Sequence, residues 1–463
     1  MAGIGFELKK VFGKGTLTSA IKGSSYAVFV TSGPMILNLI MITTMVHVLK
    51  HQEVSLEFLS FFESSIMYAY IFSLLMVSGF IMVISRYASD QLYLNNTTDL
   101  LASLIGVVAI CCVTGGIVGV VFYAASPLPV WYKFFSYQIF IELCIINVLM
   151  VYVSAVKDYK KVAGAFALGL VTTLLSSLLC IALKMDALTA VLSSVTLGFF
   201  ISILYLVSVI KGYFPNISDN TFGFLATLSR NPFLFLINML YSLGLFGHNI
   251  LFWFLSDLSI GVFGTYRFAP NYDSATFFAI FTIIPSIVIF SVKVETTFYE
   301  KFRDFDLSIC RGGTLQDIKD ARDKMSDTLK YELASIFELQ FVITVFAILL
   351  GNHLILPLLG SNQQTIELFS YLSVGFFVAY MTFIVITLLL YFNNQKSALI
   401  TALCFAGTSL LFTWITLQLG PDYYGMGLGV SALLSVSLGV YLLSKTLVDV
   451  IYRLYTSYSA DQA

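Results

Sequence analysis

The sequence predicts an all-α polytopic membrane protein with about twelve transmembrane helices. Of its 463 residues, 58% are hydrophobic and only 11% are charged, whereas soluble proteins average about 25% charged residues. The apolar residues form continuous runs and do not alternate with polar ones, which excludes a transmembrane β-barrel. Net charge is -1, which argues against a nucleic-acid partner.

Twelve apolar runs are long enough to cross a hydrocarbon core of ~30 Å, which takes about 20 helical residues. Only the residues KMD separate the fifth run from the sixth, which predicts a tight turn between two helices. The runs lie at 24–49, 58–84, 100–125, 133–156, 162–183, 187–210, 232–256, 273–292, 336–357, 366–392, 397–419 and 425–444.

Lysine and arginine residues predict the orientation of the chain. The amino-terminal segment, every second loop and the carboxyl-terminal tail together hold 21 of these residues, and the remaining loops hold four. Cytoplasmic loops of membrane proteins carry such an excess. We therefore expect both termini to lie in the cytoplasm.

The opening stretch MAGIGFELKKVFGKG precedes the first apolar run. That run is too long for a signal peptide, and Ala2 stands where myristoylation requires glycine. In a helix, Ile4 and Leu8 share a face with Val11 and Phe12, while lysines occupy the rest. The segment 1–23 is therefore expected to be a cytoplasmic amphipathic helix on the membrane surface, with a basic, disordered tail as the alternative.

Three motifs carry a resemblance to a known family: MAGIGFELKK, TSGP in the first run, and FFAIFTIIPSIVIFSVKVETTF around the eighth. They resemble the PelG family of inner-membrane exopolysaccharide transporters, a polysaccharide-transporter branch of the multidrug/oligosaccharidyl-lipid/polysaccharide (MOP) flippase superfamily. The family often has arginine at Lys9, and lysine keeps the charge.

This resemblance implies two six-helix bundles, which we expect at 24–210 and 232–444. A cytoplasmic linker at 211–231 would join them, and a cytoplasmic tail would follow at 445–463. The implied substrate is an exopolysaccharide rich in N-acetylgalactosamine, exported for the biofilm matrix. A cytosolic glycosyltransferase and other membrane subunits of the Pel synthase complex are the implied partners.

Polar stripes run along two of the apolar runs. They could line a water-filled cleft and bind sugar hydroxyls, or they could join neighbouring helices by hydrogen bonds of about 0.6 kcal/mol each. The sequence does not separate these alternatives. The stripe in the first run comprises Ser24, Thr31 and Asn38, and that in the seventh comprises Asn238, Ser242, Asn249, Trp253 and Ser256.

Ionisable residues inside apolar runs are candidates for function, because a charge at the bilayer centre costs at least ~2.5 kcal/mol. Glu63 and Glu142 could bind a coupling cation or proton, contact a passing sugar, or be paired structural carboxylates. For His248, a hydrogen bond to a neighbouring helix is the simpler interpretation. A further group gathers on one predicted periplasmic connection and could form a mouth: Asp257, Arg267 and Asp273.

The charged segment 293–335 predicts cytoplasmic helices broken at RGG, either as a simple loop or as a docking surface for a soluble partner. No P-loop or HExxH motif occurs, and the cysteines and histidines do not cluster. We therefore expect a transporter with neither catalytic residues, metal site nor cofactor. Two rivals are a cation-coupled multidrug antiporter of the same superfamily and a non-transporting scaffold for the synthase.

Overall fold

The computed structural model describes residues 17–156, 158–293 and 297–452. Within these ranges, the side chains of residues 17–32, 159, 291 and 292 lie outside the description. Twelve helices of the described part are long and apolar enough to cross a membrane, and they coincide with the twelve predicted runs. The prediction of an all-α polytopic fold is confirmed. The predicted amphipathic segment at the amino terminus falls largely outside the described residues.

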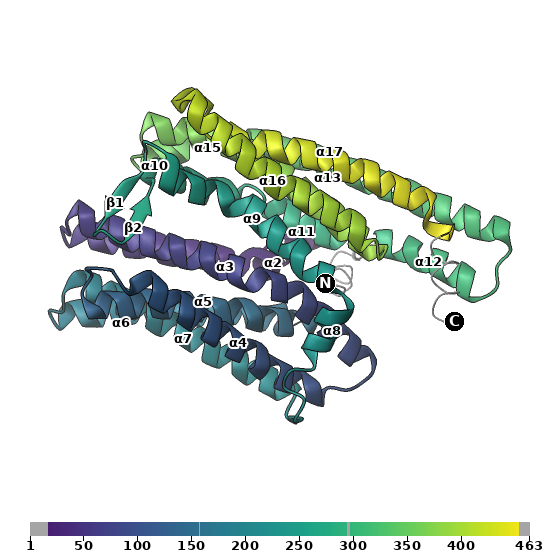
Figure 1. Cartoon of the computed structure of the whole chain (residues 1–463), viewed down its shortest axis with the longest axis horizontal. Helices are drawn as coiled ribbons and strands as arrows, with labels where there is room; N and C mark the ends of the chain where they lie inside the picture. The colour runs from purple at the N-terminus through teal and green to yellow at the C-terminus, as the bar shows by residue number, and fades with distance from the viewer. Residues whose placement is uncertain (1–16, 157, 294–296, 453–463) are drawn as a thin grey trace. The chain divides into compact units, whose positions relative to one another are not determined.

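The chain forms two compact units, each described here by itself (Figure 1). The N-terminal unit spans Phe29–Asp273. Within it, α3 packs on α5 and α9, and α7 packs on α5 and α6. Its elements are α2 (Leu17–His51, from Phe29 onward), α3 (Leu56–Tyr93), α4 (Thr98–Tyr123), α5 (Val130–Ala155), α6 (Tyr159–Ala182), α7 (Ala187–Tyr213), α8 (Phe224–Arg230), α9 (Pro232–Leu255), β1 (Ile260–Val262) and β2 (Tyr266–Phe268).

Helices α6 and α7 approach each other through glycines. A Cβ atom added at Gly169 would lie 2.8 Å from the carbonyl oxygen of Gly198, and one added at Gly198 would lie 2.7 Å from the carbonyl oxygen of Gly169. The neighbouring Ser202 hydroxyl donates to the Ala165 carbonyl across the same contact at 3.0 Å. Small residues that bring backbones close together are typical of membrane helix interfaces.

The C-terminal unit comprises Ser274–Ala463 together with Met1–Val28. Its central helix is α15, which packs against α13, α16 and α17. Its elements are α10 (Pro270–Phe281, from Ser274 onward), α11 (Ile284–Lys293), α12 (Tyr299–Cys310), α13 (Leu315–Leu350), η2 (Gly351–Ile355), α14 (Leu356–Leu358), α15 (Gln363–Tyr391), α16 (Gln395–Leu419), η3 (Pro421–Tyr423) and α17 (Met426–Val448).

Two features of this unit depart from uniform membrane helices. The eighth apolar run is broken at Thr282–Ile283 into α10 and α11, where Pro285 lacks the N–H that the carbonyl one turn earlier requires. The predicted break at RGG is present, since Gly312 adopts φ +71° between α12 and α13. The ninth run, in contrast, continues without interruption from the charged segment, so one helix, α13, holds both.

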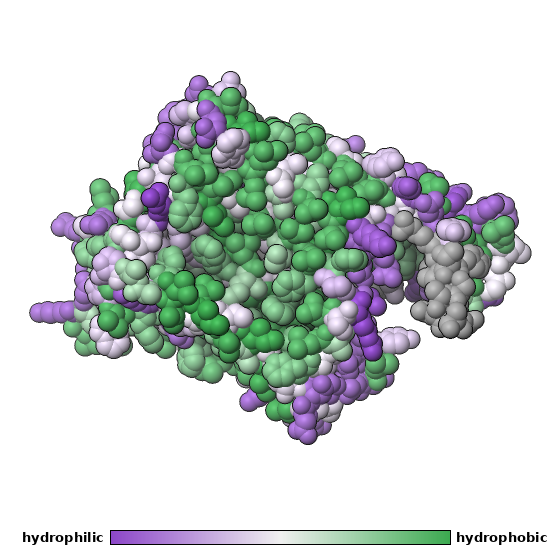
Figure 2. Space-filling view, in the orientation of Figure 1, coloured by the Kyte–Doolittle hydropathy of each residue, from purple (hydrophilic) through white to green (hydrophobic). Residues whose placement is uncertain are grey.

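The predicted domain boundaries differ in extent from the compact units. In the structure, α9 packs along α3 within the N-terminal unit, while the division into bundles at 24–210 and 232–444 stays a proposal. The predicted linker 211–231 contains the short helix α8. Figure 2 shows hydrophobic side chains covering most of the visible helical face, with hydrophilic residues gathered toward its ends, as a surface facing lipid requires.

Candidate functional site

A buried polar cluster joins α9 to the start of α10. Its centre is Asp273, which is 2% exposed. One carboxylate oxygen accepts a hydrogen bond from the Asn249 amide at 2.9 Å, and the other accepts from the Trp253 indole at 2.8 Å and the Ala269 backbone N–H at 3.0 Å. Three donors, two of them from the predicted seventh-run stripe, thus converge on one carboxylate.

Aromatic rings enclose this cluster. The Tyr68 ring of α3 stacks on Trp253 with centroids 4.2 Å apart, and Tyr272 stacks on Phe252 at 3.5 Å. The hydroxyl of Tyr272 lies 2.8 Å from Nδ1 of His248, which is fully buried. His248 therefore forms a hydrogen bond to the neighbouring helix segment, the simpler of the two interpretations that the sequence allowed.

The remaining stripe residues make other contacts or fall outside the description. The Asn238 amide donates to the Ser78 carbonyl of α3 at 2.6 Å. Ser242 on α9 and Asn38 on α2 are half-buried. Ser24 and Thr31 lie on α2, but their side chains are outside the described set. At the contacts that the structure describes, the seventh-run stripe joins helix to helix, and its lining of a cleft stays a proposal.

The residues of the predicted mouth separate into two environments. Asp257 and Arg267 are exposed, whereas Asp273 is buried in the cluster on α9. Glu63 on α3 is half-buried. The structure therefore separates the buried Asp273 from Asp257 and Arg267, which lie at the surface.

Glu142 lies near the middle of α5 and is 1% exposed. Gln138, one turn earlier, donates to one carboxyl oxygen at 3.3 Å, and the other oxygen has no hydrogen-bond partner among the described residues. No described basic side chain forms an ion pair with it. An isolated charge is very costly in such surroundings, so Glu142 remains a candidate for function.

A second buried polar network bridges the broken eighth run and α13. The Gln340 side chain is fully buried and donates to the Thr282 carbonyl at 3.1 Å and to the Thr344 hydroxyl at 2.9 Å. Its own carbonyl oxygen accepts from the Ser286 hydroxyl. Gln340 therefore satisfies a backbone carbonyl at the break, where helical bonding is interrupted.

Toward the charged end of α13, Lys293 forms an ion pair with Glu332 at 2.8 Å and donates to the Ser335 hydroxyl at 2.7 Å.

Sequence reasoning missed the roles of Gln340 and Tyr68. An amide inside an apolar run is the same signal that marked Asn238, so it could have identified Gln340. In contrast, Tyr68 is one of 26 tyrosines, and nothing in the sequence distinguishes it.

Comparison with known proteins identifies the family. The family model described as "PelG: Putative exopolysaccharide Exporter (EPS-E)" matches residues 1–455. The chain belongs to the PelG family. This membership supports polysaccharide transport by a multi-pass membrane protein and is consistent with a non-enzymatic transporter. No curated protein sequence matches this PelG-family chain.

Solved structures share the fold of this PelG-family chain. An outward-facing multidrug resistance MATE family transporter of the MOP superfamily matches with a TM-score of 0.63 and 12% identity, over 93% of this chain and 97% of that one. The inward-facing conformation of a multidrug resistance MATE family transporter of the MOP superfamily matches with a TM-score of 0.61 and 12% identity, over 92% of this chain and 99% of that one. A MOP superfamily transporter from Pyrococcus furiosus matches with a TM-score of 0.60 and 14% identity, over 92% and 96%. These likenesses confirm the predicted twelve-helix MOP fold.

Proposed function

We propose that this PelG-family chain exports a Pel-type, N-acetylgalactosamine-rich exopolysaccharide across the cytoplasmic membrane for a biofilm matrix. The observation that carries the proposal is the family match over residues 1–455. The twelve apolar helices supply a membrane-spanning scaffold of the size that the MOP transport fold uses. The excess of lysine and arginine supports a cytoplasmic location for both termini.

In the proposed mechanism, two helical bundles rock to pass the glycan through a cleft lined by the polar residues of the first and seventh runs. Either polymer synthesis or an ion gradient drives the movement. Glu142 is the favoured coupling residue, since a carboxyl buried without an ionic partner among the described residues can release and rebind a proton. Glu63 is a second candidate.

Removing the chain from its host tests the function. Surface amino-sugar polymer is expected to disappear, efflux of a panel of dyes is expected to stay normal, and the intact gene should restore the polymer. Normal polymer with altered dye efflux would overturn the proposal. That outcome would favour the second candidate function, a cation-coupled multidrug antiporter, which the buried carboxyl of Glu142 also suits.

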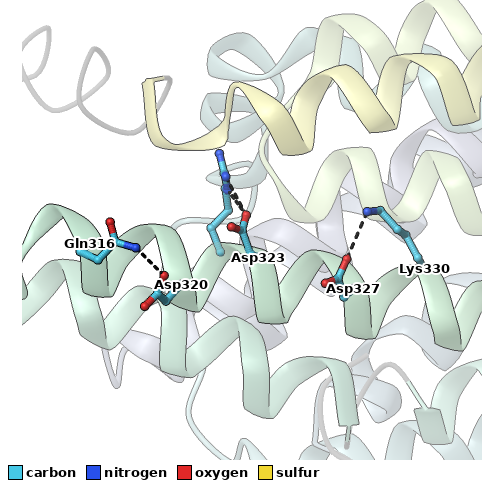
Figure 3. A network of polar contacts seen from close by, with 6 residues as sticks. Gln316, Asp320, Asp323, Asp327 and Lys330 are labelled. Atoms are coloured by element: carbon cyan, nitrogen blue, oxygen red, sulfur yellow. Dashed lines mark hydrogen bonds and ion pairs between the residues drawn. The ribbon is translucent and has the colours of Figure 1, made fainter.

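The partner in this proposal is a cytosolic glycosyltransferase that docks on α12 and the charged half of α13. One side of α13 carries a row of exposed polar residues at spacings of three and four (Figure 3): Gln316, Asp320, Asp323, Asp327 and Lys330. Gln316 donates to Asp320 at 2.8 Å, and Lys330 pairs with Asp327 at 3.2 Å. Arg322 pairs with Asp323 at 2.6 Å. These contacts lie within one helix and leave Asp323 and Asp327 mostly exposed, so the row suits a partner surface rich in basic residues.

Neutralising this row tests the docking surface. The triple variant D320N/D323N/D327N is expected to lower co-purification of the glycosyltransferase at least tenfold at 150 mM salt, with unchanged abundance of the chain. As a matched control, E53Q/E57Q removes exposed carboxylates from the predicted periplasmic side and should have no effect. Unchanged co-purification of the triple variant would refute docking at this row, whereas lost polymer without lost docking would leave the export function intact.

A further inference from the structure

The β1–β2 hairpin covers one end of the N-terminal unit. Its two strands pair antiparallel, with Val262 opposite Tyr266. It contacts α3 and α9 directly, and Figure 1 shows it beside the end of α3. Val262, Tyr266 and Phe268 are buried beneath it, whereas Gly261 and Arg267 face outward. By the count of basic residues, this end is periplasmic.

Few and neutral hydrogen bonds hold the hairpin in place. The Tyr68 hydroxyl accepts from the Arg267 N–H at 3.2 Å and donates to its carbonyl at 2.9 Å. The hydroxyls of Tyr123 and Tyr266 are 2.6 Å apart, and those of Ser126 and Thr265 are 2.7 Å apart. Burial raises the pKa of Tyr266 well above its usual value, so this hydroxyl stays neutral. Such bonds can exchange readily for bonds to water, because the net contribution of a neutral hydrogen bond to stability is small.

The hairpin turn is strained. Phe263 has φ +47°, a left-handed conformation that is unfavourable for a bulky residue. Its ring packs against Phe58 and Phe61 with centroids 5.2 and 5.8 Å away, and this packing holds the strained turn. Strands of three residues are also only marginally stable without support. The hairpin therefore depends on the surface that it covers.

That surface is aromatic. Beneath the hairpin lie Phe58, Phe61, Tyr132, Tyr68 and Trp253, which contact one another or the hairpin rings through ring centroids 4.2–6.3 Å apart. Flat apolar faces with polar hydroxyl and indole edges suit the C–H faces and hydroxyls of a saccharide. While the hairpin is closed, these rings are occupied by one another and by Phe263 and Tyr266.

We propose that the β1–β2 hairpin is a gate that lifts during export and uncovers this aromatic surface for the emerging saccharide chain, an inference that rests on the proposed function. Lifting would exchange the neutral hydrogen bonds for bonds to water and would offer the aromatic rings to sugar residues. The hairpin contacts α3 and α9, and its hydrogen-bond partners are side chains of α3, α4 and the α4–α5 connection, so the hairpin can detach without unfolding any helix.

A reversible crosslink tests the gate. The hydroxyl oxygens of Ser126 and Thr265 are 2.7 Å apart, so cysteines at both positions can reach disulfide distance. In cells that carry S126C/T265C, oxidation is expected to reduce surface polymer at least tenfold when most of the chain is crosslinked. The crosslinked fraction is measured by peptide mass spectrometry, and the loss of polymer should follow that fraction. A membrane-impermeant reductant should restore export. The two single variants should export normally under both conditions.

The matched control is N352C/S370C, which replaces another neutral polar pair on the predicted periplasmic side, where the Asn352 amide donates to Ser370 at 2.9 Å. Its crosslink should leave export unchanged. Normal export by fully crosslinked S126C/T265C would overturn the gate proposal. Failure of the S126C/T265C variant to form its crosslink in membranes would overturn it as well. A parent chain that moves no saccharide would instead refute the proposed function before any cysteine is introduced.

Discussion

Replacing Asp273 with alanine is expected to lower the free energy of unfolding by about 3 kcal/mol or more, because it removes an acceptor from three buried or nearly buried donors. Asn249 and Trp253 would then keep buried N–H groups without their acceptor. The measurement is the midpoint of thermal unfolding of the purified chain in detergent, followed by fluorescence-detected gel filtration, and it should fall by several degrees.

Asp257→Ala is the matched control, since Asp257 belongs to the same connection but is exposed. Its unfolding midpoint should stay close to that of the parent, because surface substitutions usually change stability by less than about 0.5 kcal/mol. An equal effect of the two substitutions would mean that the hydrogen bonds to Asp273 contribute little. The cluster would then not anchor α10 to α9.

The second prediction concerns Glu142. The variant E142Q keeps the shape and one oxygen of the side chain but cannot release a proton. Surface polymer is expected to fall at least tenfold, while the abundance and unfolding midpoint of the chain stay the same or rise, because a costly buried carboxyl is gone. Export by the parent chain should also fall when the proton gradient is collapsed.

Gln138→Leu provides the control for this prediction. It removes the donor to Glu142 at 3.3 Å but retains the ionisable group, so export should persist at a reduced level. If E142Q exports normally, Glu142 is a structural carboxyl, and export is driven either by polymer synthesis or by coupling through Glu63. If the E142Q chain does not accumulate in the membrane, its measured abundance will show this loss, and lower export will then not be attributed to the missing proton.

Hydropathy alone was enough to locate all twelve spans, because a run of about 20 consecutive apolar residues has few alternatives to a membrane-spanning helix. The break between α12 and α13 was also predictable, since Gly312 requires a positive φ. The break in the eighth run was not predicted, although Pro285 gives its physical reason.

The candidate site was only partly predictable. The sequence placed Asn249 and Trp253 on a polar stripe and Asp273 at a predicted periplasmic mouth, but it could not tell that the three side chains bond to one another. That outcome depends on the direction in which each side chain points. The hairpin contacts of Tyr68 depend on residues 199 positions away, which no local pattern encodes.

Helix α13 runs unbroken from Leu315 to Leu350, a length of ~54 Å at about 1.5 Å per residue. It behaves as a stiff rod, because no glycine or proline interrupts it. A tilt of ~5° imposed at its charged end would displace the opposite end by ~5 Å. A partner bound to the charged end of α13 could therefore displace the Gln340 network, and with it the break in the eighth span, by tilting this one helix.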